Sequence, residues 1–261
     1  MIADANRAVW ERDAERYAPS LALAPQEQAL LGRLRERWSA LSMLDLGVGA
    51  GRTAYTFAPL AATYVGIDYS EPMVDIARAR IAPRDGVRFE HGDARDLERF
   101  RSSPFDLVLF SYNGIDSVSH DDRLVILGQV FDVLAAGGLF LFSSHSLDAL
   151  PLASPLQRPR RGRPLSSAYR LARSLPAAFK IRRLNAGLDL AAVRRRGWVG
   201  IPDDVYDVGM ENLYVSAATQ IAELEQLGFE VCEVTDRRGR AVDPRRPGRD
   251  EWLHYLCRKP C

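Results

Sequence analysis

Short runs of apolar residues alternate with amphipathic segments along most of the chain. Runs of strand length lie at residues 43–46, 64–67, 87–90, 105–110, 139–143, 229–235 and 252–257. Segments with the apolar spacing of a helix lie at residues 4–17, 25–38, 51–60, 71–81, 121–134 and 216–227. Strands that are apolar throughout, separated by helices, indicate a parallel sheet buried on both faces. We therefore predict an α/β fold with a doubly wound, mostly parallel sheet that binds its ligand at the carboxyl ends of the strands.

The alternation breaks after Ser146 and returns near residue 211. Prolines from Pro151 to Pro176 interrupt a stretch of weak periodicity, in which we expect one or two helices, near residues 166–175 and 187–196. The prediction is a chain of three parts. Residues 1–40 form an N-terminal helical lid, residues 41–146 and 211–261 form the core domain, and residues 147–210 form an inserted cap after the fifth strand.

Charge is distributed unevenly, although the formal net charge is only +1. Twelve basic residues lie between Pro151 and Gly200, with Asp189 as the single acid among them. A basic cap favours an anionic ligand such as a phosphate, a carboxylate or a nucleotide-sugar. The alternatives are an arginine-rich surface that faces solvent, and nonspecific binding of phosphates on a membrane or a nucleic acid.

Other residue types narrow the class of protein. The three cysteines are odd in number and irregularly spaced, which argues against a disulfide framework. The four histidines are scattered and no cluster of acids accompanies them, so we expect no metal site. The first turns are charged and no apolar run reaches 18 residues, so we expect no signal peptide, no membrane span and a cytoplasmic location.

Three glycines at alternate positions follow the first predicted strand, in the segment Leu44-Asp45-Leu46-Gly47-Val48-Gly49-Ala50-Gly51-Arg52. Glycine permits a positive φ angle and removes the side chain where the backbone must approach a ligand. The N-terminus of the helix that follows offers free N–H groups to an anion such as a carboxylate. The alternative is a glycine-rich turn that binds no ligand.

An acid follows each of the next two predicted strands. Asp68 lies 17 residues after Gly51, where a carboxylate can accept both ribose hydroxyls of a nucleoside. The alternative role for Asp68 is to cap the next helix, which Ser70 fits better. Asp93, in the segment His91-Gly92-Asp93-Ala94, can accept a hydrogen bond from an adenine amino group.

Together these motifs resemble those of class I methyltransferases that use S-adenosylmethionine (SAM). The fourth strand with the loop Ser111-Tyr112-Asn113-Gly114 resembles the substrate-facing loop of that family, and Leu134–Leu141 resembles its "L-x-P-G-G" turn, with Ala136 in place of proline. The resemblance covers about residues 1–146 and 211–258. It implies a seven-stranded sheet whose last strand is antiparallel, and SAM as the cofactor.

The resemblance also implies which residues hold SAM. Asp45 steadies the glycine loop, Gly47 and Gly49 lie against the methionine part, and Tyr69 and Met73 pack near the ribose or adenine. An N-terminal helix that includes Tyr17 closes over the cofactor. The full predicted set for SAM is Tyr17, Asp45, Gly47, Gly49, Gly51, Asp68, Tyr69, Met73, Asp93, Ala94 and Ser111.

Two histidines are candidate catalytic groups, because a hydroxyl acceptor benefits from a general base and imidazole titrates near neutral pH. His145 follows the fifth predicted strand, and His120 directly precedes the helix predicted at 121–134. Each has a structural alternative, as a hydrogen-bonded loop residue or as part of a helix start. The predicted acceptor-binding residues are Tyr112, Asn113, Trp198, Asn212 and Tyr214.

The function predicted on these grounds is transfer of a methyl group to an oxygen or nitrogen atom of a small molecule or glycoconjugate, by a monomer or homodimer. Two alternatives stay open. A dinucleotide-dependent oxidoreductase shares a glycine-rich turn and an acid, but its G-x-G-x-x-G spacing places the third glycine one residue later than Gly51. A regulatory or scaffold protein that binds SAM without turnover needs only the cofactor motifs. A specific nucleic-acid methyltransferase is not expected, since the loop after the fourth strand lacks the "[DN]-P-P-[YF]" pattern.

Overall fold

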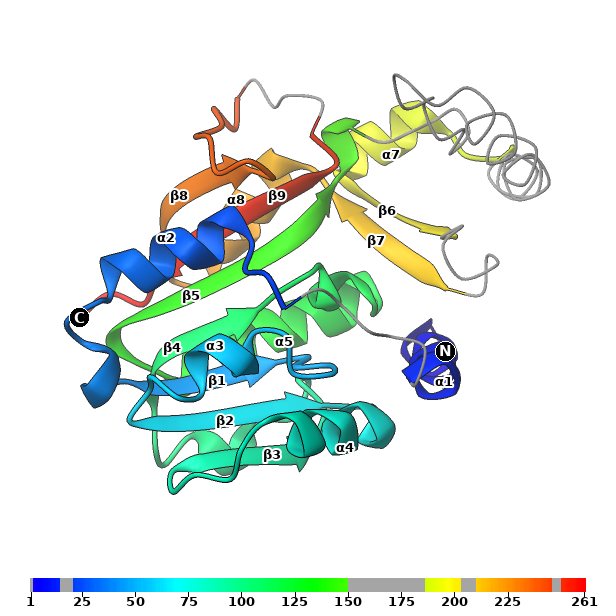
Figure 1. Ribbon diagram of the computed structural model, residues 1–261. Helices are drawn as coiled ribbons and strands as arrows, with labels where there is room; N and C mark the ends of the chain where they lie inside the picture. Colours follow the sequence, from blue (N-terminus) through cyan, green and yellow to red (C-terminus); the bar gives the residue numbers. More distant parts are fainter. Residues whose placement is uncertain (1, 15–20, 150–185, 203–209, 246–249) are drawn as a thin grey trace, which may run out of the picture.

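The computed structural model describes residues 2–14, 21–149, 186–202, 210–245 and 250–261 (Figure 1). Its strands are β1 (Ser42–Leu46), β2 (Thr63–Asp68), β3 (Val87–His91), β4 (Phe105–Phe110), β5 (Leu134–Ser146), β6 (Trp198–Pro202), β7 (Glu211–Val215), β8 (Glu230–Asp236) and β9 (Trp252–Arg258). Its α-helices are α1 (Ile2–Asp13), α2 (Pro25–Arg33), α3 (Ala54–Phe57), α4 (Glu71–Arg80), α5 (His120–Val133), α7 (Leu190–Arg196) and α8 (Ala217–Gln226). Short 3-10 helices are η2 (Trp38–Ala40), η3 (Glu98–Phe100), η4 (Gly114–Asp116) and η5 (Leu147–Ala149). Tyr17 and the helix expected at 166–175 lie outside the described residues.

Seven strands form the main sheet in the order β3-β2-β1-β4-β5-β9-β8. The pairs from β3 to β5 are parallel, whereas β9 runs antiparallel to both β5 and β8. This confirms the doubly wound, mostly parallel sheet with an antiparallel last strand. The carboxyl ends of β1, β2 and β4 point toward α1, which lies beyond that edge of the sheet (Figure 1).

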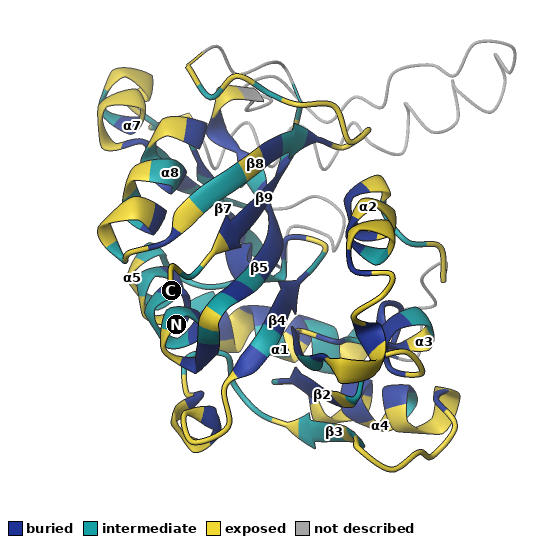
Figure 2. Ribbon diagram, turned by 90° about the vertical axis from the view of Figure 1, so that its left-hand side faces the viewer, coloured by how far each residue is buried: buried dark blue, intermediate teal, exposed yellow. Residues whose placement is uncertain are grey.

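Helices cover both faces of the sheet, as Figure 2 shows nearly edge-on. One core cluster joins the sheet to α2 and α3, through Leu30 and Phe57 among others, and another joins it to α5 and α8. Along β4, Leu107 and Leu109 belong to the first cluster and the intervening Val108 to the second, because successive side chains of a strand point to opposite faces. Burial on both faces explains why β4 is apolar almost throughout.

The predicted turn at Gly137-Gly138 is instead part of a strand. Helix α5 ends at Val133 and β5 begins at once, running for 13 residues from Leu134 to Ser146. Gly137 has a φ of +75°, and the pairing of β4 with β5 shifts register between Phe105 and Leu107. The glycine pair therefore bends an irregular strand rather than preceding a regular one.

A pair of antiparallel strands that the sequence pattern did not predict, the β6–β7 hairpin, lies across the end of the predicted insertion and the start of the next core segment. Helix α7 agrees with the helix expected at 187–196, and Asp189 caps it by accepting from the N–H groups of Ala191 and Ala192. Strands β6 and β7 follow and pair antiparallel. β7 also pairs parallel with the end of β5, at His145 and Ser146, and so lies beside the carboxyl edge of the main sheet.

Candidate functional site

A cavity of about 470 Å³ opens at the carboxyl edge of the sheet. Its walls come from the ends of β2, β4 and β5, from the loops that follow β1 to β4, from α1, α4 and α5, and from residues in or near β7 and β9. The predicted site residues that line it are Gly47, Gly49, Asp68, Tyr69, Met73, Asp93, Ala94, Ser111, Tyr112, Asn113, His145 and Asn212. Residues from both predicted sets, those for SAM and those for the acceptor, therefore line one continuous cavity.

Several predicted residues do not line this cavity. Asp45 in β1 and Gly51 at the end of the glycine loop are not among its lining residues. Tyr214 packs against the His145 ring at 4.9 Å between centroids, and Trp198 belongs to the β6–β7 hairpin. His120 lies in a separate cavity of about 160 Å³, where its ring stacks on Trp198 at 4.3 Å and its Nε2 contacts Glu223 at 2.7 Å. The functional roles assigned to these residues from the sequence stay predictions.

The loop after β1 turns sharply, and each of its glycines adopts a left-handed conformation. Gly47, Gly49 and Gly51 have φ angles of +60°, +53° and +83°. A Cβ atom at Gly47 would lie 2.8 Å from Cε2 of Phe110, so only glycine lets the loop pack against the end of β4. This close packing leaves backbone at the cavity wall.

Asp45 supports the loop from below. It is fully buried, and its Oδ2 accepts hydrogen bonds from the hydroxyls of Thr53 at 2.5 Å and Tyr64 at 2.6 Å. Burial raises the pKa of Asp45 to about 6, against the opposing effect of these hydrogen bonds. Through Thr53 the carboxyl group ties the segment after the glycines to β1 and β2.

Asp68 lies at the end of β2 and connects two loops. Its carboxylate accepts from the N–H of Gly49 and from the N–H of Ser70, both at 2.9 Å. Ser70 occupies the N-cap position of α4, but its side chain makes no capping hydrogen bond. Burial raises the pKa of Asp68 to about 6, although these backbone hydrogen bonds favour the ionised form. Each carboxylate oxygen retains a lone pair that can accept a further donor from the cavity.

Asp93 and Arg95 form the far end of the cavity, next to Ala94 and Met73. Arg95 Nη2 lies 2.6 Å from Oδ2 of Asp93, and the N–H of Arg95 donates to Oδ1 at 2.9 Å. Partial burial opposes ionisation, but the hydrogen bonds from Arg95 outweigh it and lower the pKa of Asp93. The sequence pattern did not identify Arg95 as a partner of Asp93.

The opposite end of the cavity contains a pair that sequence reasoning identified only in part. Nδ1 of His145 lies 2.9 Å from Oδ2 of Asp116, and the His145 backbone N–H donates to the same oxygen at 2.6 Å. Asp116 is completely buried, and its Oδ1 accepts from Ser144 Oγ at 3.0 Å and from Arg123. Asp116 ends a short 3-10 helix after β4, where no motif or spacing marks it in the sequence.

The loop after β4 has an unusual backbone. Tyr112 and Asn113 have φ angles of +53° and +58°, the only positive values at non-glycine residues in the described part of the chain. Such conformations cost about 1–3 kcal/mol each and concentrate at functional sites. The Asn113 N–H donates to Ser143 Oγ at 2.9 Å, and the Arg52 guanidinium lies 4.1 Å from the Tyr112 ring centroid. These contacts hold both side chains at the cavity.

A buried ion pair joins this loop to the N-terminal part of the chain. Arg52, directly after the glycine loop, contacts both carboxylate oxygens of Glu27 in α2, at 2.5 and 2.7 Å. Ser111 also donates to Glu27. Burial opposes ionisation of Glu27, but Arg52 and Ser111 together lower its pKa. The sequence pattern singled out neither Glu27 nor this use of Arg52.

Helix α1 closes one side of the cavity through Asn6. The Asn6 amide donates to the carbonyls of Ser117 at 2.8 Å and Glu211 at 2.7 Å, and accepts from the Glu211 N–H at 3.0 Å. Ala3 and Trp10 of the same helix line the cavity. A single buried amide therefore ties α1 both to the loop after β4 and to β7.

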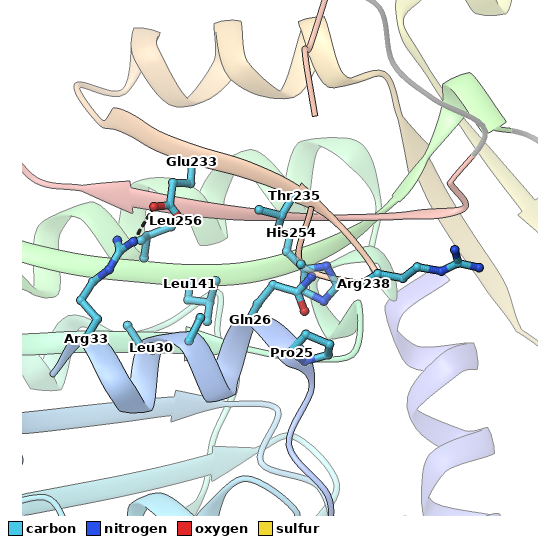
Figure 3. Close-up of a pocket in the computed structure, with 12 residues that line it drawn as sticks. Pro25, Gln26, Leu30, Arg33, Leu141, Glu233, Thr235, Arg238, His254 and Leu256 are labelled. Carbon is cyan, nitrogen blue, oxygen red and sulfur yellow. Dashed lines mark hydrogen bonds and ion pairs between the residues drawn. The ribbon is translucent and has the colours of Figure 1, made fainter. Parts of the chain in front are cut away.

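A further cavity of about 210 Å³ lies between α2 and strands β5, β8 and β9 (Figure 3). His254 and Gln26 lie close together in it, and burial lowers the pKa of His254 to about 4, so its ring is neutral. Its lining includes none of the residues predicted for the cofactor or the acceptor.

Within the described ranges, no group of His, Cys, Asp or Glu is arranged to hold a metal ion. Cys232, Cys257 and Cys261 are free thiols. None of the helices in the part of the chain that the structure describes is both long enough and apolar enough to cross a bilayer.

Comparison with protein families finds a match between residues 43–138 and the family described as "Methyltransferase domain". A demethylmenaquinone methyltransferase from Clavibacter sepedonicus is 34% identical over 110 residues, which cover 42% of this chain and 43% of that protein. The chain thus spans about half the length, or less, of the curated relatives it matches. The matched segment contains the glycine loop, Asp68 and Asp93.

Solved structures resemble nearly the whole chain. The CcbJ methyltransferase from Streptomyces caelestis aligns with a TM-score of 0.58 and 19% identity, over 95% of this chain and 96% of that one. The N-methyltransferase NodS from Bradyrhizobium japonicum, solved with S-adenosylhomocysteine (SAH), aligns with a TM-score of 0.57 and 16% identity, over 98% and 99%. Because the sequence identities are only 19% and 16%, this structural likeness establishes the fold alone.

Proposed function

We infer that this chain, which carries a class I SAM-dependent methyltransferase domain and has the corresponding fold, moves a methyl group from SAM to an oxygen or nitrogen atom of a small molecule. The observation that carries this proposal is the single cavity in which the glycine loop and Asp68 face one end and His145 faces the other. Its division into a cofactor end and an acceptor end follows the order of the strands.

The residues at the cofactor end fit SAM. Gly47 admits no Cβ, so backbone borders the space assigned to the methionine part. Asp68 keeps lone pairs for the two ribose hydroxyls, and Met73 and Ile67 supply apolar surface for an adenine ring. Asp93 and Ala94 lie where the adenine amino edge is expected. Bound SAM supplies a methyl group attached to a sulfonium sulfur, and transfer of that methyl group leaves a neutral thioether.

The remaining work of the protein is to position the acceptor and exclude water, which can contribute roughly 7–11 kcal/mol to catalysis. Trp10 of α1, Met210 before β7 and Trp252 of β9 close the sides of the cavity, and Asn6 holds α1 in place. The three-part organisation, with a lid at 1–40 and a cap at 147–210, remains part of this proposal, since most of the cap lies outside the described residues.

The acceptor end gives little support for an anionic acceptor. Among the described residues that line the cavity, the acidic and basic side chains other than histidine are Asp68 at the end of β2, and Asp93 and Arg95 in the loop after β3. The basic segment between Pro151 and Gly200 could attract an anionic small molecule or glycoconjugate, and the structure describes only the last part of that segment.

The test is calorimetric titration of the purified protein with SAM and with SAH, with NAD as a control ligand. We expect both sulfur ligands to bind, and Asp68→Ala to lose at least tenfold in affinity, because a hydrogen bond to a charged group is worth about 1.5–3 kcal/mol. The matched control is Asp75→Ala, an exposed acid of α4, which should bind like the wild type. Tight binding of NAD with no response to SAM would overturn the proposal.

A further inference from the structure

We propose that His145 is the general base of this enzyme, that buried Asp116 positions it, and that the acceptor atom is the oxygen of a hydroxyl group on an apolar, aromatic framework. This inference rests on the proposed function, since it uses the same cavity. It adds a positioning residue and a substrate class that no sequence motif indicates.

The hydrogen bonds determine which nitrogen of His145 carries the proton. Asp116 Oδ2 accepts from the His145 backbone N–H and lies 2.9 Å from Nδ1. An ionised carboxylate accepts and does not donate, so Nδ1 carries the proton and Nε2 carries the lone pair. The imidazole is thereby held in the one tautomer that can accept a proton at Nε2.

The charge on Asp116 is balanced within the protein. Arg123 is fully buried and donates to Asp116, to Gln220 and to Ser144, the last at 3.1 Å. A buried carboxylate without such a partner would be strongly destabilised as an anion. Because Arg123 places a positive charge beside Asp116, the carboxylate can also stabilise the imidazolium that forms when His145 takes up a proton.

Nε2 of His145 is held by a contact that an acceptor can replace. The Asn113 amide nitrogen lies 3.2 Å from Nε2, which is long for a hydrogen bond. Asn113 is only 3% exposed, lines the cavity, and its Oδ1 has no partner among the described residues. A hydroxyl that displaces the amide can donate to Nε2 while a second donor of the acceptor satisfies this buried carbonyl oxygen.

The surroundings of the His145 ring favour an apolar, aromatic acceptor. The ring lies 4.9 Å from Tyr214 and 5.8 Å from Trp252, and the Trp252 ring lies 5.7 Å from Tyr112. The other side chains at this end include Met210 and Val118. No Lys or Arg among the described residues lines this end, and the one acid beneath it is paired with Arg123. The Arg237 guanidinium lies on the Trp252 ring, 4.7 Å from its centroid, and is not part of the cavity lining.

A hydroxyl also needs the base more than an aromatic amine does. A neutral aromatic amine attacks through a lone pair that is already free, whereas a phenol is a poor nucleophile until its proton leaves. In the proposed step the acceptor oxygen forms an O–C bond to the methyl group as the C–S bond breaks, and the electron pair of that bond stays on sulfur. The hydroxyl proton moves to His145 Nε2 and later to solvent.

The first test reads the base without any turnover. In protein labelled with ¹⁵N-histidine, the His145 ring signals are identified by their loss in His145→Gln. We expect the Nδ1–H tautomer above the pH at which the ring is protonated, and a shift of the Nε2 signal when 4-ethylphenol is added with SAH present. 4-Ethylanisole, which lacks the proton, should leave that signal unchanged. A ring found as the Nε2–H tautomer, or equal responses to both probes, overturns the proposal.

The second test measures transfer of a radiolabelled methyl group from SAM to a panel of simple phenols and their matched anilines. We expect phenols to be labelled at a rate that rises as His145 loses its proton, and His145→Gln to lose about 10²–10⁴-fold in kcat with unchanged affinity for SAH. Labelling of anilines alone, or of no phenol by protein that binds SAM, overturns the inference. If the wild-type protein does not bind SAM, the proposed function itself is overturned.

Asp116→Asn separates positioning from structure. The asparagine amide would donate to Nδ1 and move the ring proton to Nε2, so kcat should fall with the tautomer change visible in the ¹⁵N spectrum and with SAH still bound. If the unpaired Arg123 prevents folding, His145→Gln still decides the question, since His145 has no ion pair except with Asp116 in the described part of the chain.

Discussion

The two ends of the cavity hold their buried carboxylates in opposite ways. Asp68, at the cofactor end, accepts only backbone N–H groups, and its pKa rises to about 6. Asp116, at the acceptor end, accepts hydrogen bonds from Arg123, Ser144 and His145. One carboxylate is left open to the cavity and is costly to ionise, whereas the other is enclosed by donors from the protein.

This difference matches the role proposed for each carboxylate. A carboxylate that must bind hydroxyl groups of a ligand needs unused lone pairs, and the ligand itself then supplies the missing donors. A carboxylate that must hold a histidine in one tautomer needs a fixed charge in a fixed place, whether or not a ligand is bound. We therefore expect the cofactor end to depend on ligand and pH, and the acceptor end to depend on its internal ion pair.

The largest effect should come from removing the charge partner at the acceptor end. Arg123→Met leaves Asp116 buried without its cation and should lower the free energy of unfolding by about 3–5 kcal/mol. Urea unfolding followed by tryptophan fluorescence measures this. The matched control is Arg101→Met, whose partners Glu98 and Asp132 are exposed, with an expected loss of about 1 kcal/mol or less. Equal losses in the two variants would show that the Asp116 site is not enclosed in this way.

The next effect concerns the uncompensated carboxylate at the cofactor end. Because the pKa of Asp68 is raised in the folded protein, the folded chain retains a proton that the unfolded chain releases, and stability falls as pH rises from about 4 to 6. Over that interval Asp68 costs roughly 3 kcal/mol, and the full cost persists above it. Asp68→Asn should therefore show a smaller fall in the free energy of unfolding between pH 4 and 7 than the wild type. Parallel stability curves for the two proteins would contradict the raised pKa.

A smaller loss should follow when the link from α1 to the loop after β4 and to β7 is cut. Asn6→Ala leaves the N–H of Glu211 and the carbonyls of Ser117 and Glu211 without this partner, at a cost of about 1–3 kcal/mol. Hydrogen exchange of residues 2–13 should speed up. Arg7→Ala is the control, since the Arg7–Glu11 pair is partly exposed and worth only about 0.3–0.5 kcal/mol. Unchanged exchange in Asn6→Ala would mean that other contacts hold α1.

The smallest expected effect is on ligand affinity. Below about pH 6 Asp68 takes up a proton and loses acceptor capacity, so the affinity for SAH should fall by about tenfold per pH unit. Asp93 remains ionised over this range because its pKa is lowered, so it does not contribute to the change. Calorimetry from pH 7 to pH 5 measures it, with Asp75→Asn as a control that should keep the wild-type slope. A constant affinity would show that SAH does not depend on the Asp68 carboxylate.

More of the residues predicted for the cofactor than of those predicted for the acceptor line the cavity, for a physical reason. A glycine loop and the acids after β2 and β3 occupy local segments at strand ends, and parallel strands bring those ends together. Asp68 and Asp93 could therefore be chosen from neighbouring sequence alone. Even there, the Arg95 partner of Asp93 was missed, because a side chain two residues away has no characteristic spacing.

The acceptor end brings together residues that are far apart in the chain. Asp116 and His145 are 29 residues apart, and Asn6 reaches Glu211 across 205 residues. His145 could be proposed because it comes just after the fifth predicted strand, although the structure extends β5 to Ser146 and so places His145 within the strand. Asp116 could not, since a single acid in a short turn resembles any solvated loop acid. His120 was chosen on the same reasoning as His145 but lies in another cavity, because the direction of a side chain at a helix start is set by tertiary packing with Trp198.

The fold was predictable where burial alone decides it. Apolar strands with helical connections identified the seven strands of the main sheet. The β6–β7 hairpin was missed because Trp198–Pro202 is short and contains glycine and proline, and because its pairing with the end of β5 is not local. The early start of β5 was missed because Gly137 and Gly138 were read as a turn.

The way the β6–β7 hairpin joins the sheet has an evolutionary consequence. Only two residue pairs, His145 with Tyr214 and Ser146 with Val215, connect β7 to β5, and β6 is the edge strand beyond it in the described sheet. Insertions or substitutions in the hairpin can therefore reshape the wall around the acceptor without shifting the register of the seven-stranded sheet. In an evolving lineage, the range of acceptors can change through this appendage while the cofactor end is inherited unaltered. The same division makes the hairpin the natural unit to exchange when a new acceptor is sought by protein engineering.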